Sequence, residues 1–96
     1  MELELAVSSL SALAQPTRLR VIRLLSGHPD GVMAGELARM VEIPRNTMSA
    51  HLAILSRAGL VSGERNGREI VYRADAARIL EIGSFVAACA HGTADE

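Results

Sequence analysis

Apolar residues recur every three or four positions along most of this chain, a spacing that predicts a mainly helical fold. One such stripe, of Leu3, Val7, Leu10 and Leu13, predicts a first helix. A second helix is expected over residues 17–26, opened by a proline, and its apolar residues on most sides place it in the core. The same spacing predicts three further helices, over residues 34–41, 45–58 and 76–90.

Two short segments, residues 60–65 and 68–74, are rich in β-branched and aromatic residues, which predicts strands. Asn66 and Gly67 lie between them, and this dipeptide is a strong hairpin signal in which both turn positions are expected to have positive φ. The predicted order is α-α-α-α-β-β-α. Two short helices joined by a tight turn that ends at Pro44, followed by a hairpin, predict a winged helix-turn-helix fold, mainly α with a small β-hairpin wing.

A length of 96 residues predicts one domain over 1–96. Hydrophobic residues make up 49% of the chain and are almost all aliphatic, which is more apolar material than a monomer of this size easily buries. The stripe of the first helix and the segment ILEIGSFVAACA in the last helix have nowhere to bury within one domain. We therefore expect a homodimer with the first and last helices as its interface.

Several classes of protein are not expected. No apolar segment reaches the roughly 18 residues that a membrane helix requires, and Met1 is not followed by a secretory signal, so the chain is predicted to be cytoplasmic without membrane contact. An enzyme is not expected, because Cys89 and His91 point about 200° apart on a helix and no glycine-rich phosphate loop is present. No cofactor is predicted.

Positive charge is concentrated in the segment that contains the fourth helix and the hairpin. The chain carries a net charge of −1. Residues 45–73 carry five Arg and two acidic residues, a net +3, whereas residues 1–44 carry −1 and residues 74–96 carry −3. A local basic face attracts phosphate even on a nearly neutral protein, although a merely solvated face would have the same composition.

The fourth predicted helix has a polar outward face at its N-terminal end, opposite a core stripe of Met48, Leu52 and Leu55. Arg and Asn side chains can pair with guanine and adenine edges, while Ser and Thr hydroxyls and the first N–H groups suit phosphate. Ser and Thr are also common at helix starts for structural reasons alone. The pattern predicts a helix that enters a major groove, with the candidate DNA-binding residues Arg45, Asn46, Thr47, Ser49, Ala50 and Arg57.

The predicted hairpin tip adds Arg65, Asn66 and Arg68, which would protrude toward an adjacent DNA backbone or minor groove. His51 lies about 60° from the core stripe and is expected to be a partly buried, hydrogen-bonded packing residue rather than a base reader or metal ligand. A winged-helix module that only assembles proteins is the alternative function. Such a module would not need these basic residues on one surface.

Two segments, ALAQPTRLRVIRLL and MSAHLAILSRAGLV, resemble the second helix and the recognition helix of the ArsR/SmtB family of winged-helix transcriptional repressors. The resemblance covers about residues 8–90. It implies a homodimer that binds double-stranded operator DNA at an imperfect palindrome and is released by a small-molecule or thiol-reactive inducer.

The resemblance does not extend to the metal ligands of the family. The third helix contains ELARMVEI, without the cysteine motif of many arsenic sensors, and Ala77 follows Asp75 where zinc sensors have histidine. Of a terminal cysteine pair only Cys89 is present. We therefore expect no high-affinity zinc or inorganic arsenite site. Cys89 is either a sensing thiol or a small buried hydrophobic residue.

Overall fold

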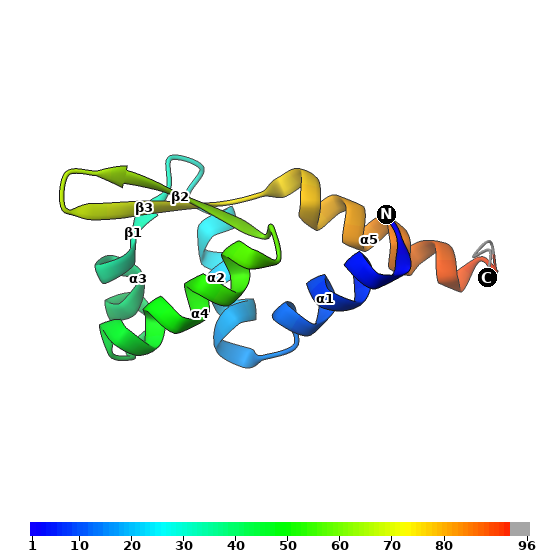
Figure 1. Cartoon of the computed structure of the whole chain (residues 1–96), viewed down its shortest axis with the longest axis horizontal. Helices are drawn as coiled ribbons and strands as arrows, with labels where there is room; N and C mark the ends of the chain where they lie inside the picture. Colours follow the sequence, from blue (N-terminus) through cyan, green and yellow to red (C-terminus); the bar gives the residue numbers. More distant parts are fainter. Residues whose placement is uncertain (93–96) are drawn as a thin grey trace.

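The computed structural model describes residues 1–92 and has the predicted winged helix-turn-helix architecture, with one additional strand (Figure 1). Residues 93–96, the last of the expected domain, lie outside the described residues. The elements in chain order are α1 (Leu3–Leu13), α2 (Pro16–Ser26), β1 (Val32–Met33), α3 (Ala34–Val41), α4 (Arg45–Arg57), β2 (Val61–Asn66), β3 (Glu69–Ala74) and α5 (Ala76–Ala90).

The core lies between α2, α3 and α4 and is closed by the first residues of the hairpin. Its fully buried side chains include the predicted stripe of Met48, Leu52 and Leu55, which is thereby confirmed. Leu37 of α3 and Leu60, just before β2, complete the buried contact around that stripe. Because this face of α4 is fixed by packing, the opposite face of the helix points outward.

The turn between α3 and α4 sets how the two helices of the motif meet. Glu42 ends α3 in the left-handed conformation, with φ of 62°, and Ile43 donates its N–H to the Ala38 carbonyl at 3.0 Å. Left-handed helix ends usually use glycine, so a glutamate here is an uncommon choice. Pro44 then occupies the N-cap position of α4, and its fixed φ suits the extended conformation found there.

The sheet has three antiparallel strands in the order β1-β3-β2. The sequence did not predict β1, because its two residues are too short a segment to show alternation and they directly follow a turn. Val32 pairs with Tyr72 and Met33 with Val71, so this strand anchors the start of α3 to the base of the wing.

The hairpin turn differs from the prediction by one residue. Asn66 pairs with Glu69 as the last rung of the ladder, so the two turn positions are Gly67 and Arg68 rather than Asn66 and Gly67. Only Gly67 has positive φ, at 67°, as expected for a turn of type II′, which requires positive φ only at its first central position. Asn66 therefore remains in the strand, and Arg68 lies at the tip.

Helices α1 and α5 pack against each other at one end of the molecule, while the wing and the first turn of α4 lie at the other (Figure 1). The body measures 46 × 21 × 20 Å along its principal axes. Most of the large apolar side chains that stay exposed belong to these two helices, and include Leu3, Val7, Leu10, Leu80 and Val86.

Candidate nucleic-acid interface

The N-terminal turn of α4 presents polar groups to solvent. No side chain caps the helix at its N-cap residue Pro44, so the first backbone N–H groups remain available to an anion. Asn46, Thr47, Ser49 and Ala50 are all exposed, as the predicted outward face requires. The helix therefore offers an amide, two hydroxyls and free N–H groups in its first two turns.

The wing adds two further positive charges beside Arg45, the first residue of α4. Arg65 and Arg68 are exposed near the tip of the hairpin, beside the exposed Asn66. Within residues 1–92, neither arginine forms an ion pair. Unpaired guanidinium groups at a protruding tip are suited to phosphate oxygens, which they can contact through two parallel hydrogen bonds.

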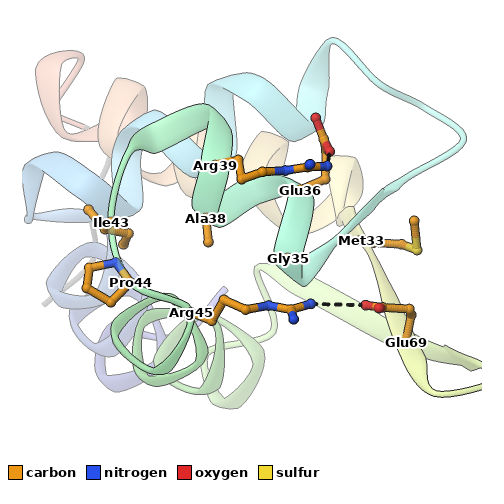
Figure 2. A pocket seen from close by; sticks show the side chains of 9 residues that line it. All are labelled: Met33, Gly35, Glu36, Ala38, Arg39, Ile43, Pro44, Arg45 and Glu69. Carbon is orange, nitrogen blue, oxygen red and sulfur yellow. Dashed lines mark hydrogen bonds and ion pairs between the residues drawn. The ribbon is translucent and has the colours of Figure 1, made fainter.

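Arg45 does not simply point outward from the front of α4. Its Nη2 lies 3.6 Å from Oε1 of Glu69, the first residue of β3, and its guanidinium passes beside Gly35 of α3 (Figure 2). These residues line a cleft of about 440 Å³ between α3, α4 and the wing. The side chains of Arg45 and Glu69 are 71% and 42% exposed, so the pair directs the arginine but contributes at most about 1 kcal/mol.

Gly35 and Glu69 were not among the sequence candidates. The available signal was the hairpin register, because a turn at Gly67 and Arg68 places Glu69 opposite Asn66 at the wing tip. With the turn predicted one residue earlier, at Asn66 and Gly67, Glu69 was not expected opposite Asn66.

Arg57 lies at the other end of α4 from the polar turn. At 1.5 Å per residue it is about 16 Å along the helix from Asn46, too far to read the same base pairs. It lines a cleft of about 380 Å³ between α1 and α4, together with Ser8, Ser11 and Arg18. Any DNA contact made by Arg57 is therefore separate from the contacts of the first turn.

His51 is part of a hydrogen-bonded junction, which confirms the packing role expected of it. Its Nδ1 lies 3.2 Å from Nη1 of Arg18, and Nε of the same arginine donates to the Ala12 carbonyl at 2.6 Å. The backbone N–H of Arg18 also donates to the side-chain Oε1 of Gln15 at 2.8 Å. This network joins α1, α2 and α4 behind the outward face.

Within residues 1–92, the side chains of the C-terminal helix join no cluster of potential metal ligands. Among the described residues, no three side chains of the His, Cys, Asp and Glu types gather closely enough to hold a metal ion. Cys89 is a free thiol that is exposed in the single subunit, so it is not a buried packing residue there. No helix within residues 1–92 is long and apolar enough to cross a membrane.

Comparison with known proteins shows which family this chain belongs to. A family model described as a helix-turn-helix domain matches residues 13–64. The transcriptional regulator YgaV of Escherichia coli is 38% identical over 69 residues, which are 72% of this chain and 69% of YgaV. The transcriptional repressor SmtB of Mycobacterium tuberculosis is 41% identical over 71 residues, 74% of this chain. The chain belongs to the ArsR/SmtB family.

This ArsR/SmtB protein has the fold of solved relatives. It is similar to Mb0332 of Mycobacterium bovis, a homodimeric winged helix-turn-helix DNA-binding domain, with a TM-score of 0.74 at 24% identity over 96% of this chain and 83% of that one. The match spans only about half the length of SmtB, 51%. Family membership confirms the expected winged-helix fold and identifies a transcriptional regulator rather than an enzyme.

Proposed function

We propose that this ArsR/SmtB regulator is a cytoplasmic homodimeric repressor that binds double-stranded operator DNA and is released by an inducer. The observation that carries the proposal is the exposed polar first turn of α4 beside the unpaired arginines at the wing tip. A helix N-terminus suits the major groove, and the wing then lies over the adjacent backbone or minor groove.

Symmetry determines how two such surfaces meet DNA. The apolar faces of α1 and α5 lie at the end of the molecule opposite α4's first turn (Figure 1). If these faces pair about a two-fold axis, the two α4 helices project from one side of the dimer. They can then enter successive major grooves, with half-sites about 10 base pairs apart.

Three side-chain groups have separate roles in this proposal. Asn46, with Arg45, reads base edges at the front of α4. Thr47, Ser49 and Ala50 allow close approach and bind phosphate. The third group contacts the DNA backbone or minor groove and consists of Arg57, Arg65, Asn66 and Arg68.

Selection of duplexes from a random pool by the purified protein, followed by footprinting, tests the proposal. We expect an enriched sequence with two half-sites separated by about one helical turn. A single unrepeated half-site bound by a monomer would contradict the dimeric arrangement. No binding to any duplex at low or moderate salt would instead favour a module used for protein assembly.

A further inference from the structure

The guanidinium of Arg45 is held between three elements that the chain brings together from distant positions. Glu69 of β3 faces it on one side, and Gly35 of α3 lies along its length (Figure 2). Glu36, the nearest other acid in this cleft, is already paired with Arg39. Arg45 is therefore aimed at the wing carboxylate.

Gly35 creates the space in which Arg45 lies. A Cβ at this position would lie 2.8 Å from Cζ and 3.0 Å from Nε of the arginine, and closer still to Nη2. Glycine within a helix lowers helix stability relative to alanine, and the φ of Gly35 is not in the region that favours glycine. The lack of a side chain at Gly35 thus serves the path of Arg45 rather than the conformation of α3.

Glu69 stands where a carboxylate opposes DNA binding. It pairs across the hairpin with Asn66 and follows Arg68, so it lies next to the tip that is to meet phosphate. A negative charge in that position repels DNA of every sequence. The contact between Glu69 and Arg45 gives this carboxylate a second effect, on the orientation of Arg45, which can offset the repulsion.

We propose that Glu69 is a specificity-determining positioning residue that acts through Arg45. This inference rests on the proposed DNA binding. On unrelated DNA, phosphates compete with Glu69 for the guanidinium, and the displaced carboxylate is left repelling the backbone. On the operator, Arg45 donates its remaining N–H groups to a base edge while Glu69 keeps its own contact. Discrimination is a difference of affinities, and a repulsive group that acts mainly on the wrong partner increases it.

The test compares the dissociation constants for the selected operator and for an unrelated duplex of equal length. For Glu69→Gln we expect tighter binding to unrelated DNA, little gain on the operator, and a ratio that falls about fivefold or more, the smallest effect of one lost oriented base contact. Glu64→Gln is the matched control. Glu64 is also a wing acid, but it pairs with Arg73 at 3.1 Å and does not contact Arg45. It should shift both affinities equally and leave the ratio unchanged.

Two further variants separate positioning from simple charge removal. In an Arg45→Ala background, Glu69→Gln should no longer change the ratio, because the side chain it positions is absent. Gly35→Ala should displace the flexible end of Arg45 and lower the ratio as Glu69→Gln does, while the melting temperature stays the same or rises.

Three results would overturn the inference. One is equal behaviour of the Glu69→Gln and Glu64→Gln proteins, and another is an effect of Glu69→Gln that persists without Arg45. The third is an unchanged ratio in the folded Gly35→Ala protein. If the native protein enriches no duplex, the proposed function itself is wrong. If it enriches an operator and the variants give one of these three results, only the positioning role of Glu69 is wrong.

Discussion

Arg45 and Asn46 are adjacent on α4, but their side chains have different surroundings. Arg45 reaches across to Glu69, whereas Asn46 is exposed at the front of the helix, and Arg68 lies on the wing tip. At the scale of single residues, the proposed interface therefore contains an oriented arginine, a freely presented amide and a protruding point charge. The contribution of each type of group to DNA affinity depends differently on DNA sequence and on salt concentration.

Asn46→Ala and Arg68→Ala should weaken DNA binding in distinguishable ways. Loss of a base contact at Asn46 is expected to weaken operator binding by about 1–3 kcal/mol and to leave unrelated DNA nearly unaffected. Loss of a phosphate contact at Arg68 should weaken both duplexes and lower the slope of log affinity against log salt by about one unit. Arg65→Ala is expected to behave as Arg68→Ala does.

DNA titrations at several salt concentrations measure the affinities for both duplexes and the slope of log affinity against log salt. Arg23→Ala on α2 is the control for removal of a positive charge elsewhere. A wing variant that changes sequence preference, together with an Asn46 variant that does not, would show that the roles are reversed.

At the scale of elements, α5 is joined by hydrogen bonds to the C-terminal end of α4. Arg78 of α5 donates from Nη1 to the Ala58 carbonyl at 2.8 Å, where α4 ends, and the guanidinium lies below Gly59. The Asp75 N–H donates to the Leu60 carbonyl at 2.9 Å, and the Asp75 carboxylate caps α5 by accepting from the Arg78 N–H. Three hydrogen bonds thus connect or order the junction between α4, the wing and α5.

Arg78→Ala should lower the free energy of unfolding by about 1.5–3 kcal/mol, the range for a hydrogen bond to a charged group. The reason is that the partly buried Ala58 carbonyl loses its partner at a helix C-terminus. Urea unfolding measures the change. Arg73→Ala, which breaks only the exposed pair with Glu64, is the control and should cost less than about 1 kcal/mol. Equal effects of the two substitutions would show that Arg78 acts as an ordinary surface charge.

The sequence predicted the elements better than their connections. Helical periodicity located the five helices of residues 1–92, because buried stripes such as that of Met48 and Leu52 repeat with the helix period. The strand β1 was missed, and the turn was predicted one residue early, because Asn-Gly favours two positive φ values whereas this hairpin needs one at Gly67. The exposed polar turn of α4 was predicted from the helical wheel. The partner of Arg45 was not, since a contact between α4 and β3 depends on tertiary packing.

At the scale of the whole molecule, several large apolar side chains remain exposed to solvent in the single subunit. Leu80 is 70% exposed on α5, beside a groove that Phe85 and Ala88 also line. Leu19 of α2 is 47% exposed but lies outside the expected interface. These two leucines provide a matched pair for testing the proposed homodimer.

Leu80→Glu should convert the dimer into a monomer at micromolar concentration, whereas Leu19→Glu should not. Two-fold symmetry removes the leucine twice, at about 1.5–3 kcal/mol each, so the dimer dissociation constant should rise by at least about a hundredfold. Sedimentation equilibrium measures the constant, and circular dichroism verifies that each variant folds. A Leu80→Glu protein that remains dimeric would place the interface elsewhere.

Inorganic arsenite and zinc should not release the protein from its operator. A closed zinc site needs four Cys, His or carboxylate ligands, and no three such side chains gather among the described residues. Arsenite binds several thiolates, and one chain offers a single thiol, Cys89. Two subunits bring two such thiols, which would suffice for an organic arsenical or for an intersubunit disulfide only if the ends of the two α5 helices meet in the dimer. Operator release by zinc, arsenite, an organic arsenical and peroxide, compared between the native protein and Cys89→Ser, measures the response. Tight stoichiometric zinc or arsenite binding with release would contradict the expectation.

The elongated shape has a mechanical consequence. Since the apolar faces of α1 and α5 lie at one end of a 46 Å body and the wing tip at the other, each subunit acts as a lever arm. A relative rotation of about 5° at the pivot displaces the far end by roughly 4 Å, more than the length of a hydrogen bond. In the proposed repressor, an inducer would therefore not need to deform the winged domain to release DNA. In the proposed complex, a small rotation of the two subunits against each other would displace both α4 helices from their major grooves.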